Sequence, residues 1–149
     1  MANYRDIGVS DAPFKAGVDL TQKAYYFVAP GSVAGEVIVA VGPSGNPWPV
    51  GILQNSPSSG QEAQVRVLGF SKAVVEANAC SLRWGAWLNC ASDGQAEPHA
   101  TAAEGVTAHG GSPTVARYMD SGTVSSGSAI AQVMIHFKIE GVCGFMGAS

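Results

Sequence analysis

The clearest pattern in the chain is an alternation of apolar and polar positions from residue 131 to residue 140. The odd positions hold Ala, Val, Ile, Phe and Ile, while the even positions hold Gln, Met, His, Lys and Glu. Successive side chains of a strand point to opposite sides, so a period of two is typical of a strand with one buried face. We therefore predict a half-buried strand here, with Met134 as the apolar exception on its polar face.

Shorter apolar runs that stop at turn residues recur through the rest of the chain. Residues 24–29 (AYYFVA) stop at Pro-Gly, residues 36–41 (EVIVAV) stop at Gly-Pro, and residues 63–75 resume the strand pattern after a turn rich in Pro, Ser and Gly. No segment has the length and period of a helix that could build an α/β fold, and we find no repeat of fixed period. The sequence predicts an all-β protein, a small β-barrel or sandwich.

Segments outside this pattern define the expected domain organisation. Residues 1–21 mix Gly, Asp and Pro with isolated apolar residues, which predicts an extended N-terminal arm. Residues 22–140 are expected to form a single β domain with a long surface loop at 91–112, and residues 141–149 form an apolar C-terminal tail. Large apolar residues of the arm and tail, with one tryptophan of the domain, are candidate contacts with other proteins: Tyr4, Ile7, Val9, Phe14, Trp48, Phe145 and Met146.

The charge composition limits the classes of partner. Charged residues make up 13% of the chain, against a typical value of about 25%, which fits either a surface covered by partners or a solvated surface rich in Gly, Ala and Ser. The net charge of −3 and the scattered Lys and Arg argue against nucleic-acid binding. No apolar run approaches the roughly 20 residues of a membrane span, and the first residues lack the apolar core of a signal peptide. We expect a soluble chain made in the cytoplasm, with no membrane partner.

The three cysteines do not form a recognisable framework. Cys80, Cys90 and Cys143 are odd in number and widely spaced, and no C-x-x-C pair is present for zinc or redox chemistry. We expect free, partly buried thiols, with a disulfide between Cys80 and Cys90 as the alternative.

Motifs for catalysis and cofactor binding are absent. The chain has no G-x-S-x-G elbow and no glycine-rich phosphate loop. His99 and His109 could converge with Glu97 or Glu104 on a metal ion or in a hydrolytic site, but solvated loop residues are the simpler interpretation. His136 falls on the polar face of its strand and is expected to face water or a neighbouring subunit. We therefore predict no enzyme activity, no cofactor and no metal site.

Trp48, Trp84 and Trp87 allow a second interpretation. Aromatic rings can stack on sugars in β-sandwich modules, although tryptophans of small β proteins usually lie in cores or interfaces. A carbohydrate-binding module on a virion or cell surface is therefore the alternative function, and a solvent-facing tryptophan beside polar side chains would favour it.

The order of several short segments resembles the decoration proteins, also called cement or head-stabilising proteins, of tailed-phage capsids. The resemblance covers roughly residues 20–96 and rests on LTQKAYYFV at 20–28, PVGILQN at 49–55, GQEAQVRV at 60–67 and DGQA at 93–96, with Gly69, Ser71, Lys72 and Gly85 between them. It implies a small β-barrel or sandwich of jelly-roll or β-tulip type, which a strand like that of residues 130–139 closes.

The resemblance also implies a function. Such a protein binds the outer surface of the assembled phage capsid and stabilises the virion, with the major capsid protein as its partner. It implies self-association as well, as a trimer ahead of a dimer. The candidate contact residues named above would then touch the capsid or other subunits.

Overall fold

The described part of the computed structural model comprises residues 8–42, 48–77, 81–99 and 114–138, with side chains up to His136. These residues form strands and no helix, which confirms the prediction of an all-β protein. None of them therefore belongs to a helix long and apolar enough to cross a membrane. The strands are β1 (Ser10–Ala16), β2 (Phe27–Pro30), β3 (Glu36–Val39), β4 (Gly51–Leu53), β5 (Glu62–Ala77), β6 (Trp87–Cys90), β7 (Ala96–Pro98), β8 (Thr114–Tyr118) and β9 (Gly127–Lys138).

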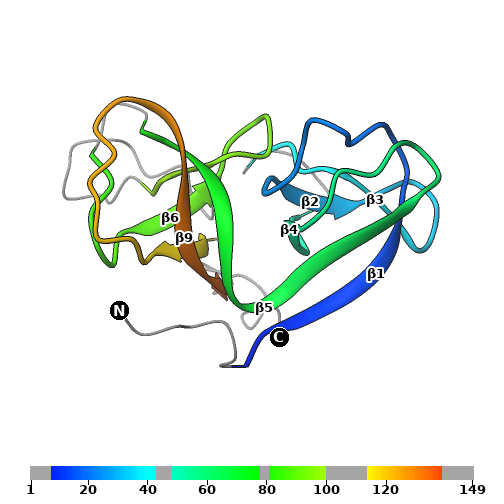
Figure 1. Ribbon diagram of the computed structural model, residues 1–149, viewed down its shortest axis with the longest axis horizontal. Coiled ribbons are helices and arrows are strands. Elements are labelled where there is room, and N and C mark those ends of the chain that lie inside the picture. Colours follow the sequence, from blue (N-terminus) through cyan, green and yellow to red (C-terminus); the bar gives the residue numbers. More distant parts are fainter. Residues whose placement is uncertain (1–7, 43–47, 78–80, 100–113, 139–149) are drawn as a thin grey trace, which may run out of the picture.

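The strands close into two rings that share β5 (Figure 1). In the first barrel the order is β1, β3, β2, β4, β5 and back to β1. In the second barrel it is β5, β7, β6, β8, β9 and back to β5. Closed rings leave no unpaired outer strand, so the described body lacks the open sheet edges that favour aggregation.

Strand β5 serves both barrels because it bends at Gly69. Residues 62–68 pair with β1 and β4, whereas residues 69–77 pair with β9 and, at Val75, with β7. Gly69 has a φ of 94°, and a Cβ atom there would lie only 2.7 Å from the carbonyl oxygen of Gly8. Only glycine fits both this conformation and this close approach.

Two apolar cores follow from the alternation of side chains along the strands. The smaller core fills the first barrel and consists of Ala16, Leu20, Val28, Val37, Leu53, Ala63 and Val65. The larger core fills the second barrel and continues to the first, where it includes Phe27, Ala29 and Ile52. Val28 thus belongs to the core of its own barrel, while its neighbours Phe27 and Ala29 pack with the second barrel.

The two barrels repeat one topology. In each, the first and third strands pair in parallel, and the remaining four pairings are antiparallel in the same order. The register makes residues 63–65 and 131–133 equivalent, because Val65 pairs with Leu53 as Val133 pairs with Tyr118. Both segments read Ala-Gln-Val, and each follows a Ser-Ser-Gly sequence, at 58–60 and at 125–127.

The sequence analysis found no repeat of fixed period, and the lengths of the connections explain why. A longer connection between two strands adds little conformational entropy cost, so equivalent strands can be joined by loops of different length. Here β3 and β4 are joined by residues 40–50, whereas the longer segment 99–113 joins β7 and β8. No fixed period therefore relates the two halves of the sequence.

The expected limits of the arm and the loop are also corrected. Residues 10–16 form β1 inside the first barrel, and Leu20 is fully buried, so residues 10–21 do not belong to an arm. Ala12, Phe14 and Ala16 do alternate along β1, but the intervening Pro13 and the small alanines hide the pattern. Within the expected loop 91–112, residues 96–98 form β7. Residues 1–7, 100–113 and the tail 141–149 lie outside the described residues.

The repeat supplies a matched pair of positions that tests the contact between the barrels. Gly35 and Gly94 end equivalent turns with φ values of 85° and 87°. A Cβ atom at Gly94 would lie 2.6 Å from Cγ1 of Val39 and 3.0 Å from the carbonyl oxygen of Phe27, whereas one at Gly35 meets nothing within 4 Å.

Both Gly35→Ala and Gly94→Ala should therefore incur the left-handed backbone cost of about 1–2 kcal/mol. Gly94→Ala also forces atoms apart at the barrel interface, which should lower the free energy of unfolding by a further 1–3 kcal/mol or so. Urea unfolding of the two variants measures the difference. Equal losses would show that the barrels are not packed together at this turn.

Candidate functional site

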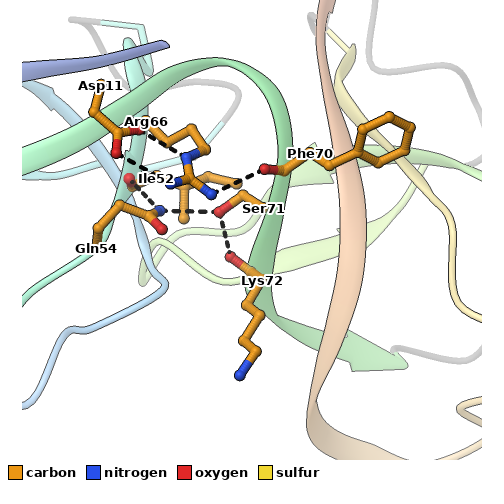
Figure 2. A network of polar contacts seen from close by, with 7 residues as sticks. All are labelled: Asp11, Ile52, Gln54, Arg66, Phe70, Ser71 and Lys72. Carbon is orange, nitrogen blue, oxygen red and sulfur yellow. Dashed lines mark hydrogen bonds and ion pairs between the residues drawn. The ribbon is translucent and has the colours of Figure 1, made fainter. Parts of the chain in front are cut away.

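The most extensive polar cluster braces the bend of β5 (Figure 2). Nε and Nη2 of Arg66 donate to the two carboxylate oxygens of Asp11 in β1, at 2.7 and 3.0 Å. Its remaining nitrogen, Nη1, donates to the carbonyl oxygen of Phe70 at 3.1 Å. One guanidinium group therefore joins β1 to the residues on both sides of the bend.

A second brace comes from Gln54, the residue that follows β4. Nε2 of Gln54 donates to the carbonyl oxygen of Ile52 and to Oγ of Ser71, both at 2.9 Å. The Ser71 hydroxyl in turn donates to the carbonyl oxygen of Lys72 at 2.8 Å. Since Gln54 follows the first barrel's β4 and Ser71 lies beyond the bend, these contacts tie the two barrels together.

The electrostatics of this cluster are those of a structural ion pair. The hydrogen bond from Arg66 is the main reason that the pKa of the Asp11 carboxyl lies below its ordinary value of 3.8, and the same bond raises the pKa of Arg66. Each group is thereby held in its charged form near neutral pH. The cluster offers neither a proton to donate nor a base to accept one.

The described cysteine is chemically inert. Cys90 is buried and free, so it forms no disulfide with Cys80. Burial, more than any other cause, raises the pKa of its thiol to about 12. A protonated, inaccessible thiol is neither a nucleophile nor a metal ligand. Cys80 and Cys143 lie outside the described residues.

The histidines considered for a metal or hydrolytic site do not form one in the described part of the chain. Nδ1 of His99 lies 2.8 Å from Oδ1 of Asn89, so its partner is an amide rather than a carboxylate. His109 and Glu104 fall outside the described residues. Within those residues, no group of three or more His, Cys, Asp or Glu could hold a metal ion.

The second barrel carries an aromatic and cationic surface that we call the Trp84 surface, formed by Trp84, Trp87, Arg117 and His136. The guanidinium of Arg117 lies 4.4 Å from the ring centroid of Trp87 and donates twice to the carbonyl oxygen of Gly85, at 3.2 and 3.1 Å. The exposed His136 meets Trp87 edge to face, with ring centroids 5.3 Å apart. Trp84 itself is 60% exposed.

The residues proposed from the sequence as contacts are differently placed. Val9 is half-buried beside Gly69, and Phe14 is half-buried against the core of the first barrel. Trp48 remains 41% exposed. The other four candidates, Tyr4, Ile7, Phe145 and Met146, lie outside the described residues. The Trp84 surface was not predicted, because sequence alone does not show which tryptophan faces solvent.

Comparison with known proteins gives a fold relationship. No protein-family model matches the chain, and no curated protein sequence matches it. Among solved structures, the chain is similar to the head fiber gp8.5 N base in bacteriophage phi29, with a TM-score of 0.59 and 16% sequence identity. The match covers 90% of this chain and all of that one. At such low identity the likeness establishes a common fold.

The brace at the bend yields a prediction with an internal control. Arg66→Met introduces the residue found at the equivalent position of the second barrel, Met134, and removes all three charged hydrogen bonds. It should lower the free energy of unfolding by about 1–3 kcal/mol. Lys15→Met, which removes a single charged hydrogen bond from the exposed Lys15 to Glu36, should cost less than about 1 kcal/mol.

The pH dependence gives a second readout of the same variants. Because the pKa of Asp11 is lowered in the folded state, its pairing with Arg66 stabilises the fold above pH 3.8. This stabilisation is lost as the pH falls further. The stability gap between wild type and Arg66→Met should therefore narrow below that pH. Urea unfolding that finds equal losses for the two variants, or a gap independent of pH, would rule out the brace.

Proposed function

We propose that the protein is a non-enzymatic virion component that binds the outer surface of an assembled phage capsid and stabilises it. The observation that carries this proposal is the likeness, over nearly the whole chain, to a protein named as the base of a phage head fiber. The partner is the major capsid protein of a tailed phage, and the protein acts on the virion exterior after synthesis in the host cytoplasm.

The chemistry of the described residues supports a binding role. The strongest polar cluster is a structural brace, the Cys90 thiol is protonated, and His99 pairs with an amide. Two closed barrels provide a rigid body whose backbone is paired internally. A ligand that binds only the assembled shell stabilises it by RT ln(1 + [L]/Kd), which is about 2.7 kcal/mol per site at 100 times Kd. Repetition over many sites makes weak contacts effective.

The contacts that we propose lie mainly at the two ends of the chain. Phe145 and Met146 stand between glycines in a segment without charge, where large apolar side chains favour burial against a partner. With Tyr4, Ile7, Val9, Phe14 and Trp48 they form the candidate contact set. We propose that the chain is a homo-oligomer, a trimer ahead of a dimer.

Co-sedimentation with expanded heads tests the proposed function. The chain should sediment with assembled heads and should not bind unassembled shell protein. Deleting residues 2–7, which precede the barrel, should weaken binding to heads and leave the urea midpoint unchanged, since β1 begins only at Ser10. Equal binding to assembled and unassembled shell protein, or no binding to either, would refute the capsid role.

One observation favours carbohydrate binding as the second candidate. Trp84 faces solvent next to the exposed Arg83, which is the arrangement that this alternative requires. Trp87 is less suitable for stacking on a sugar because Arg117 lies over its ring. Binding of host-surface glycans that is lost in Trp84→Ala, in the absence of heads, would establish this function instead.

A further inference from the structure

The repeat makes it possible to compare one face of the first barrel with its equivalent on the second. Phe27 pairs with Ile52 in the first barrel as Trp87 pairs with Arg117 in the second. The hydrogen bonds on the other side of these two residues are equivalent as well. The amide of Ala40 donates to the carbonyl oxygen of Phe27, and the amide of His99 donates to the carbonyl oxygen of Trp87. The Trp84 surface is therefore the counterpart of the Phe27 and Ile52 face.

In the first barrel this face is the contact with the second barrel. Phe27 and Ile52 are fully buried and belong to the core that fills the second barrel. The amide of Phe27 donates to the carbonyl oxygen of Gly94 at 2.8 Å. The turn between β6 and β7, residues 91–94, thus sits directly on the face.

In the second barrel a turn of the same shape presents a tryptophan to solvent. The amides of Tyr25 and Gly85 donate to equivalent carbonyl oxygens, those of Leu53 and Tyr118, both at 2.8 Å. Tyr25 and Gly85 also share a left-handed conformation, with φ values of 68° and 79°. The residue before them is Ala24 in one turn and the exposed Trp84 in the other. The turn therefore does not require a tryptophan, and Trp84 is available for recognition.

The turn that packs on the Phe27 and Ile52 face also has a counterpart, and that counterpart is exposed. The turn at 91–94 corresponds to the turn at 31–35, because the amides of Ala91 and Gly31 donate to the carbonyl oxygens of Gln95 and Glu36. Gly94 is buried against the first barrel, whereas its counterpart Gly35 has nothing within 4 Å of a Cβ position. Val33, in the same turn, is 57% exposed. The molecule thus carries a second copy of each half of an interface that it already makes internally, and Val33 and Trp84 expose side chains on these copies.

We propose that the turn at 31–35 of one molecule docks on the Trp84 surface of a second copy, continuing between chains the contact made between the barrels. Such a contact is heterologous, joining two different surfaces, so it closes into a ring or extends as a filament. Replacement of Phe27 and Ile52 by Trp87 and Arg117 makes the intermolecular surface more polar than the internal one. Tryptophan and arginine are the residues that most often dominate such interfaces.

Cysteine cross-linking of the full chain tests the pairing of surfaces. In a Cys80→Ser and Cys143→Ser background, Val33→Cys marks the turn and Arg83→Cys marks the Trp84 surface. Under mild oxidation, cross-linked dimers should form in a mixture of the two variants and not in either alone. Cross-linking of Arg83→Cys with itself would show a two-fold symmetric contact and overturn the proposal, as would the absence of cross-links in the mixture.

Light scattering supplies the energetic test. Trp84→Ala should weaken self-association at least about tenfold, the effect of losing roughly 1.4 kcal/mol at an interface. Leu68→Ala, which removes a comparably exposed apolar side chain from the first barrel, should leave self-association unchanged. A monomeric wild type, or equal association of all three proteins, would overturn the proposal. The assay contains no heads, so its failure is distinguishable from failure of the capsid role.

Discussion

The shared strand β5 is the constraint on which the rest of the structure depends. Its first half closes the first barrel and its second half closes the second, so neither ring is complete without it. The bend at Gly69 is possible because no side chain occupies the space beside Gly8. Arg66 and Gln54 then fix the angle by joining residues before and after the bend. A single strand thereby sets both the closure of the barrels and their relative position.

Sharing a strand also explains how two barrels of the same topology form one continuous body. The first barrel packs its Phe27 and Ile52 face on the β6–β7 turn of the second, and the core extends without interruption across that contact. The second barrel has the same face with a different composition, in which Arg117 stacks on Trp87 and Trp84 faces water. Equivalent faces are thus buried in the core in one barrel and carry the exposed Trp84 in the other.

Sequence patterns predicted those strands whose side chains are large and alternate regularly. The period-two segment near the C-terminal end is β9, and the apolar runs beginning at residues 24, 36 and 63 overlap β2, β3 and β5. Strands β1, β7 and β8 escaped prediction. Pro13 and small alanines weaken the alternation of β1, and β7 and β8 have only three and five residues. The bend at Gly69 was not foreseen, since the strand pattern continues through it on both sides.

The candidate docking surface around Trp84 was harder to predict than the fold. Exposure of Trp84 depends on how the turn is held by Tyr118 and Arg117, which are more than thirty positions away in sequence. The repeated topology was hidden because the connection between β7 and β8 is longer than that between β3 and β4. The exposure of Trp84 and the repeated topology both depend on long-range strand pairing, which carries no local signal in the sequence.

Native-state hydrogen exchange of the β5 amides tests most directly whether one strand makes the two barrels interdependent. Val65 lies in the half that belongs to the first barrel, and Val75 lies in the half that belongs to the second. If neither barrel can open alone, both amides should exchange only through global unfolding, with the same free energy and the same dependence on urea. Exchange of either half through a separate opening, at a free energy lower by about 2 kcal/mol or more, would contradict this account.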